Sequence, residues 1–212
     1  MSATVEKINW EEIYSLYNTI KWLYALCEET DPQLNTNLQP LNEFRAALDH
    51  LMRIVAIERL DDYKDKNAAD EAKKLRSHLR RALFDICDMV SINYRNKIVD
   101  ILESYTVDEI QNALPMYYSE IRPRIEMISE EIASLRTEKR FNSCEEEENA
   151  VDKYPGIVRE LQGYYKAVVQ AQPSLIEIRQ KGRKKKINNV FVQWVLPVVA
   201  IIVAIIIACV GK

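Results

Sequence analysis

Residues 190–210 read VFVQWVLPVVAIIVAIIIACV, a run of 21 residues without a charged side chain. As an α-helix, about 20 residues extend about 30 Å, which is the thickness of the hydrocarbon core of a bilayer. The run therefore predicts one transmembrane helix, followed only by Gly211 and Lys212. Residues 1–9 include charged Glu6 and Lys7 and lack the apolar core of a secretory signal. We expect a tail-anchored, single-pass membrane protein.

Basic residues flank this run unevenly. One lysine follows it, and five basic residues lie just before it: Lys181, Arg183, Lys184, Lys185 and Lys186. The positive-inside rule then predicts a cytoplasmic N-terminal body. The same residues also favour contact with anionic lipid headgroups, worth about 1 kcal/mol per basic side chain.

The composition of the body excludes several classes of function. Before Lys181 the chain has 23 basic and 32 acidic residues, which is not the basic footprint of a general duplex nucleic-acid binder. Two histidines and four glycines leave little material for a metal centre or a glycine-rich phosphate loop, so we expect no metal and no cofactor. The cysteines are widely spaced and are expected to be reduced thiols: Cys27, Cys87, Cys144 and Cys209.

Apolar residues recur every three or four positions along most of the chain, which predicts an all-α protein. We expect a cytosolic helical bundle over residues 1–140 and a helical juxtamembrane segment over 157–189. Between them, residues 141–156 read FNSCEEEENAVDKYPG. Four consecutive glutamates repel one another and Pro-Gly breaks helices, so an acidic loop or linker is expected there.

The first helix is expected to begin at Asn9, which forms a capping-box pattern with Glu12. Its apolar side chains then recur at spacings of three and four, as in a coiled coil: Trp10, Ile13, Tyr17, Ile20, Tyr24 and Cys27. Leu16 and Leu23 widen this seam on one side. Two interpretations stay open, a helix packed in its own bundle and a seam that binds other helices.

Four more helices are expected in the body. One covers residues 41–60 and another covers residues 68–96. A short helix is capped by Thr106 with Glu109, and the next, over residues 116–140, is expected to kink near Ile121 because of Pro123. The helix over 41–60 is predicted to bury Leu41, Phe44, Leu48, Leu51, Met52 and Val55.

Basic residues border the apolar stripe of the helix over 68–96. Lys73, Arg76 and Arg80 share one side of it, and Lys74 and Arg81 lie on the other. Such residues often pair with nearby acids. The alternative is a pocket for an anionic ligand, since the guanidinium fork suits phosphate. The candidate ligand-binding residues are Arg45, Arg53, Lys73, Arg76, Arg80 and Arg81.

Within the predicted span, small residues recur at every fourth position, and two further residues fall near the same side: Ala200, Ala204 and Ala208, with Gln193 and Pro197. Small residues let transmembrane helices approach closely, so this side is a candidate packing or pore-lining face. A plain membrane anchor is the alternative. If several copies form a pore, Gln193 is the polar residue at its inner mouth and Pro197 a point of bending.

Arg45 and His50 resemble the R-x4-6-H motif of HEPN-domain ribonucleases, which are all-helical and cleave RNA without a metal. On one regular helix, however, these two side chains point about 140° apart. A structural contact between Arg45 and Asp49 is the competing interpretation.

The overall architecture resembles the membrane effectors of bacterial anti-phage systems controlled by nucleotide signals, such as the channel protein of the Hailong system. The resemblance implies a homo-oligomer, taken as a tetramer, in a bacterial inner membrane. It also implies an anionic nucleotide or oligonucleotide ligand and ion leakage as the output. We therefore expect a ligand-gated membrane effector and no enzyme. The rival expectation is a tail-anchored tether or adaptor that binds partner helices through the N-terminal seam, and a HEPN-like ribonuclease is third.

Overall fold

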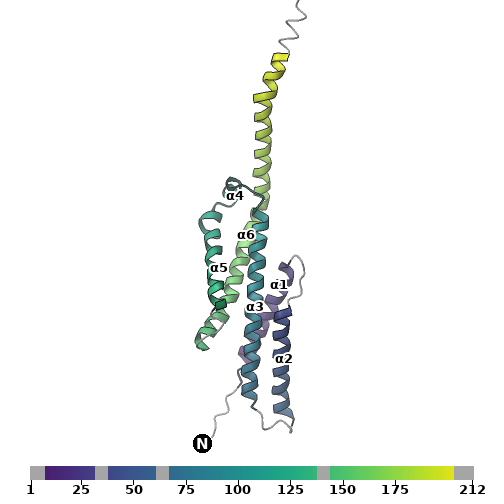
Figure 1. Cartoon of the computed structure of the whole chain (residues 1–212), viewed down its shortest axis with the longest axis vertical. Coiled ribbons are helices and arrows are strands. Elements are labelled where there is room, and N and C mark those ends of the chain that lie inside the picture. The colour runs from purple at the N-terminus through teal and green to yellow at the C-terminus, as the bar shows by residue number, and fades with distance from the viewer. Residues whose placement is uncertain (1–7, 32–37, 61–66, 138–143, 203–212) are drawn as a thin grey trace, which may run out of the picture. The chain divides into compact units, whose positions relative to one another are not determined.

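The computed structural model describes residues 8–31, 38–60, 67–137 and 144–202, and these residues form helices and no strand (Figure 1). The prediction of an all-α protein is confirmed for this part of the chain. Two compact units are formed, and each is described by itself. The first comprises residues 1–99 and 123–165, and the second comprises residues 100–122 and 166–212.

Helix α1 (Trp10–Thr30) begins at the predicted Asn9 cap, whereas the Glu12 side chain of the predicted capping box bonds Arg76 and Arg80. The side-chain oxygen of Asn9 accepts a hydrogen bond from the backbone N–H of Glu12 at 3.2 Å. The helix ends where Asp31 turns to an extended conformation and its N–H bonds the carbonyl of Cys27 at 3.0 Å. These bonds satisfy backbone groups that a helix end leaves without partners.

The predicted coiled-coil seam of α1 is divided between core and solvent. Ile13, Ile20 and Cys27 are buried with Leu16 and Leu23 in the core of the first unit. Trp10 and Tyr17 are instead 43% and 45% exposed. The interpretation of α1 as a bundle helix therefore holds for its inner side, and its outer side remains an exposed apolar surface.

Helix α2 (Leu38–Arg59) forms, but its predicted burial is wrong. Of the six predicted core residues, Phe44 and Leu51 are partly buried. The other four are exposed: Leu41, Leu48, Met52 and Val55. Ala47 and Ile54 face the core instead. The rotation follows from two polar residues, because Glu43 and His50 lie on the side that meets α3 and bond partners there.

Helix α3 (Ala68–Leu102) lies beside α2 and supplies much of the core (Figure 1). It runs past the end predicted near Asn96. Tyr94, Ile98 and Leu102 are all buried at four-residue spacing, so the helix continues for as long as its apolar stripe does.

A π-helical segment, η2 (Tyr117–Ile121), precedes α5 (Arg122–Thr137). The backbone N–H of Arg122 bonds the carbonyl of Tyr117, five residues earlier. Pro123 has no N–H and its ring crowds the preceding turn, and a wider turn accommodates both effects. The irregularity predicted near Ile121 is thus confirmed.

The acidic segment is not a linker over its whole length, so this prediction is wrong. Helix α6 (Cys144–Val190) begins within it and runs through Pro155 and Gly156. Pro155 is buried, as are Ala150 and Tyr154. The Tyr154 ring meets Phe84 edge-on, with centroids 5.4 Å apart. Packing within the first unit outweighs the local tendency of this sequence to leave the helix.

In the second unit, α4 (Val107–Ala113) has the predicted capping box. The Thr106 hydroxyl accepts from the N–H of Glu109 at 3.3 Å, and the Glu109 carboxylate accepts from the N–H of Thr106 at 2.9 Å. The helix ends before Pro115, as predicted. Ile110, Leu114 and Tyr117 are buried, so the short helix is held by its apolar side.

The helical path of α6 continues into η3 (Phe191–Val195) and then to residue 202. Every side chain described between residues 192 and 202 is exposed. Within the described residues, no helix combines the length and the apolar character needed to cross a bilayer. Ala204, Ala208 and the rest of the predicted span lie outside the described residues.

Candidate functional site

Two of the candidate ligand-binding arginines hold a carboxylate of the same protein. Arg76 and Arg80, one turn apart on α3, each donate to a different oxygen of Glu12 on α1, both at 2.9 Å. All three side chains are largely buried, with 12–27% exposure. Glu12 is thus doubly clamped near the start of α1, which fixes this helix on α3.

The other candidates are distributed over separate places. Arg81 bonds Glu43 at 3.1 Å, and Arg53 bonds Asp49 at 2.7 Å. Lys73 is exposed on α3 and also interacts with a neighbour. Arg45 is exposed on α2, and the contact predicted between Arg45 and Asp49 is replaced by the one from Arg53. The structure thus pairs Arg53, Arg76, Arg80 and Arg81 with nearby acids.

Arg80 also lines a polar pocket of about 410 Å³ in the first unit. Its walls come from the start of α1 and from α6, where Asp152 and Arg159 contribute opposite charges. The Arg159 guanidinium lies 5.0 Å from the centre of the Trp22 ring. The pocket therefore combines two arginines with two carboxylates, those of Glu12 and Asp152, and its formal charge is balanced.

The two histidines of the chain meet between α2 and α3. His50 and His78 stack with ring centroids 5.2 Å apart. Each also bonds a glutamate of the opposite helix, since His50 Nδ1 lies 2.7 Å from Glu71 and His78 Nδ1 lies 2.7 Å from Glu43. The sequence carries a signal for this cluster that we did not use: each helix has a glutamate seven residues before a histidine, which places both on one side.

This arrangement leaves His50 in a structural role. Its ring is held by Glu71, and Arg45 points into a different region, an apolar groove described below. The HEPN-like pair is therefore not brought together. Hydrogen bonds from Lys74 and then from His50 lower the pKa of Glu71 to about 2, so this carboxylate is ionised at neutral pH and joins α2 to α3.

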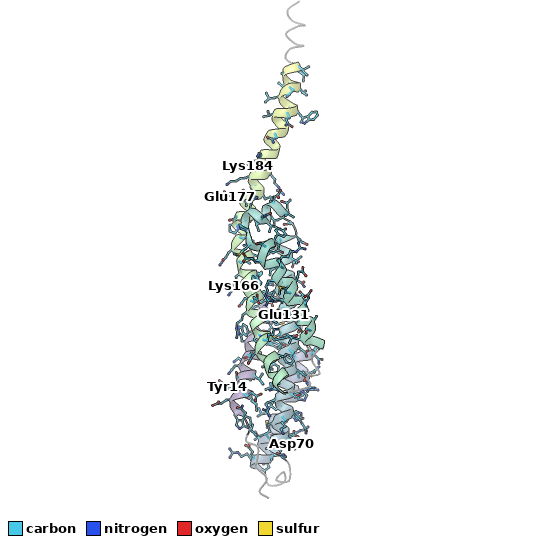
Figure 2. The ribbon with its side chains drawn as sticks, turned by 90° about the vertical axis from the view of Figure 1, so that its left-hand side faces the viewer. Tyr14, Asp70, Glu131, Lys166, Glu177 and Lys184 are labelled. Carbon is cyan, nitrogen blue, oxygen red and sulfur yellow. The ribbon has the colours of Figure 1, made fainter. Side chains whose placement is uncertain are left out.

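An apolar groove of about 730 Å³ lies between α1 and α2 in the first unit. Leu75 and Leu79 of α3 line it, and Trp10, Tyr14 and Tyr17 belong to its α1 side. Tyr14 is 67% exposed and lies on the outer side of α1 (Figure 2). The groove contains the outer half of the seam predicted for α1, where a partner helix was expected to bind.

In the second unit, Arg179 of α6 joins several groups beside α4. Its guanidinium lies 3.7 Å from the centre of the Tyr105 ring, donates to the carbonyl of Ser104, and lies 3.7 Å from the Glu109 carboxylate. The backbone N–H of Thr106 is the main cause that lowers the pKa of Glu109. Sequence analysis missed Arg179, because no local pattern marks a side chain that acts across the fold.

The basic flank and the candidate pore face lie on the same helical path. Lys181, Arg183, Lys184 and Lys185 are exposed, and Lys186 is helical. Lys184 is labelled in Figure 2. Gln193, Pro197 and Ala200 are exposed as well. Gln193 lies within η3. In a regular α-helix the backbone carbonyl of Gln193 would accept a hydrogen bond from the N–H of residue 197, but Pro197 has no N–H. This widened turn is consistent with the bend predicted at Pro197.

Comparison of the chain with protein-family models, with curated proteins and with solved structures finds no match. Among the described residues, no three histidine, cysteine, aspartate or glutamate side chains are placed to hold a metal ion. The functional argument therefore rests on the residues and contacts described above.

Proposed function

We propose that the protein is a tail-anchored, oligomeric membrane effector, with residues 190–210 in the bilayer and the helical body in the cytoplasm. One observation carries this proposal. From Val192 to Ile202 the described side chains are exposed, and Trp194 is exposed to 70%. Such a helix is stable when lipid or other apolar helices cover it. The apolar run continues in the sequence to Val210.

The basic flank supports the orientation of the proposed anchor. Its exposed cations occupy the last turns before the apolar stretch, where anionic headgroups of the cytoplasmic leaflet would meet them.

We further propose that the C-terminal helices associate through Ala200, Ala204 and Ala208 and form a pore, with Gln193 at its inner mouth. Small side chains allow close approach of helices in lipid. The π-helical turn at Gln193 adds support, because such turns are frequent at functional sites.

The proposed ligand is an anionic nucleotide or oligonucleotide that competes with Glu12 for Arg76 and Arg80. A ligand shifts a conformational equilibrium only if it binds the two states differently. Displacement of Glu12 meets this condition, because it would release the clamp that holds α1 on α3. The polar pocket beside Arg80 gives such a ligand a place to bind.

Flux measurements test the pore. Purified full-length protein is placed in potassium-loaded liposomes, and release is followed with and without a short single-stranded DNA. Replacing Ala200, Ala204 and Ala208 by leucine is expected to reduce release strongly. A matched control changes Val198, Ile202 and Ile206 to leucine, about half a turn away, and is expected to keep it. Release that is equally small for the unmodified protein and both variants would refute the pore.

The apolar groove of the first unit favours a second candidate, a membrane tether or adaptor. In that case a helix of a different protein occupies the groove beside Trp10 and Tyr14, and the membrane concentrates the pair. Expression without membrane depolarisation, together with a stable complex with a helical partner, would support this candidate over the pore.

A further inference from the structure

We infer that two copies of this chain pair through the outer side of α2, with Leu48 on a two-fold axis. The inference rests on the oligomer proposed above and names the surface that joins its copies. We call this surface the α1–α2 face and define it by its exposed apolar residues: Trp10, Tyr14 and Tyr17 of α1 with Leu41, Leu48, Met52 and Val55 of α2.

The spacing on α2 indicates that a helix covers this face. Its side chains follow the three–four repeat of a coiled-coil seam: Leu41, Phe44, Leu48, Leu51 and Val55. Leu48 at the centre is 58% exposed, while Ala47 and Ile54 form a different stripe that faces the core. From Leu41 to Val55 the seam extends about 21 Å. An amphipathic helix matches this length, and a small apolar ligand in the groove would leave most of it uncovered.

The area of the face fits an interface between proteins. At about 200 Å² for a large aromatic side chain and about half that for an aliphatic one, its seven partly exposed residues present about 500 Å² of apolar surface per copy. Two copies would therefore cover about 1,000 Å², near the lower limit for a specific interface. An apolar patch of this size is often a functional surface.

The flank of the seam carries one positive and one negative residue. A second copy of the chain would match both charges, whereas a purely acidic or purely basic partner would match only one. Arg45 and Asp49 lie on the same flank of α2 and line a shallow depression of about 550 Å³ with Leu48 and Met52. In an antiparallel pair centred on Leu48, Arg45 of one copy lies about 3 Å along the axis from Asp49 of the other. The two-fold axis repeats this contact. Asp49 now pairs with Arg53 on the exposed surface, where such a pair contributes little and exchanges readily.

A cysteine on the axis tests the pairing directly. The full-length protein in detergent carries Cys144→Ser and Cys209→Ser, and Leu48→Cys is added. Closely packed antiparallel helices bring such a residue and its copy within disulfide range. We expect mild oxidation to give mostly dimer, and little dimer from the control Met127→Cys on α5, which is 55% exposed. Equal cross-linking of the two variants, or none from Leu48→Cys, would overturn the interface.

Charge exchange separates this interface from association through the tail. Arg45→Glu is expected to lower cross-linking at position 48 several-fold, and adding Asp49→Arg is expected to restore it, because each contact is then reversed. A double variant no better than the single one would overturn the pairing. Native mass measurement separates the failure of this interface from the failure of the proposed oligomer. If the protein is oligomeric but Leu48→Cys does not cross-link, only the interface is wrong. If the protein is monomeric, the proposed oligomer is wrong as well. If Leu48→Cys cross-links in cells only to a different protein, and not to a second copy, the α1–α2 face binds the partner of a tether.

Discussion

Replacing Glu71 by glutamine removes the charge that joins α2 to α3 while keeping the shape of the side chain. Glu71 lies 2.7 Å from His50 Nδ1 and 2.7 Å from Lys74 Nζ, and its side chain is 13% exposed. Its pKa falls from 4.5 to about 2, with the Lys74 hydrogen bond as the largest cause. At 1.36 kcal/mol per pKa unit, the shift corresponds to at most about 3–4 kcal/mol of folding free energy. Lys74 is 54% exposed, so solvent screening reduces the expected loss to about 1–2 kcal/mol at neutral pH.

The dependence of this effect on pH has a definite sign. Because the folded state lowers the pKa, the stabilisation is complete above the unfolded value of 4.5 and is lost as the pH falls toward about 2. Urea unfolding of the full-length protein in non-ionic detergent, followed by circular dichroism, measures the difference between unmodified protein and Glu71→Gln. The control Glu177→Gln breaks an exposed pair with Lys181 and should have no measurable effect. A Glu71→Gln protein as stable as the original at neutral pH, or equally less stable at every pH, would refute the reasoning.

Three further predictions concern local structure and activity. Thr106→Ala removes the capping hydroxyl of α4 and should cost about 1 kcal/mol, seen as faster amide hydrogen exchange in Val107–Ala113, whereas unchanged exchange would contradict the role of the cap. Leu161→Ala empties a fully buried position and should lower the free energy of unfolding by about 2–5 kcal/mol, while Met127→Ala, at an exposed position, should change it little; equal effects would contradict the assigned core. His50→Ala should leave any ribonuclease activity of the purified protein unchanged, because Glu71 holds this ring away from Arg45, and a specific loss of RNA cleavage would restore the HEPN-like hypothesis.

Local signals predicted much of the fold. The caps at Asn9 and Thr106 act within three residues, so the sequence alone identifies both helix starts. Pro123 likewise explains the irregular turn before α5. A proline lacks the N–H that would bond the carbonyl four residues earlier, whatever its surroundings.

The sequence predictions were wrong where the structure depends on contacts between residues that are far apart in the sequence. Periodicity identified α2 as apolar on a wide arc but did not say which side faces inward, and the bonds from Glu43 and His50 to α3 set that rotation. Pro155 likewise breaks helices by local rules, yet it is buried in α6 beside Tyr154. Tertiary packing is the missing information in both cases.

The candidate site was predicted with less success for the same reason. The sequence places Arg76 and Arg80 on one side of α3, but it does not show that Glu12 of α1 occupies both of them. The exposed seam of α2 was visible as a three–four repeat, and only the structure distinguishes it from the core stripe through Ala47 and Ile54.

Alkaline extraction of membranes tests the central claim most directly. Membranes from cells that express the full-length chain are washed with sodium carbonate at high pH, which strips peripheral proteins, and the chain is then followed through sedimentation. If residues 190–210 lie in the bilayer, the chain stays with the membrane pellet and is released by detergent. Recovery of the intact chain in the carbonate supernatant would contradict the account.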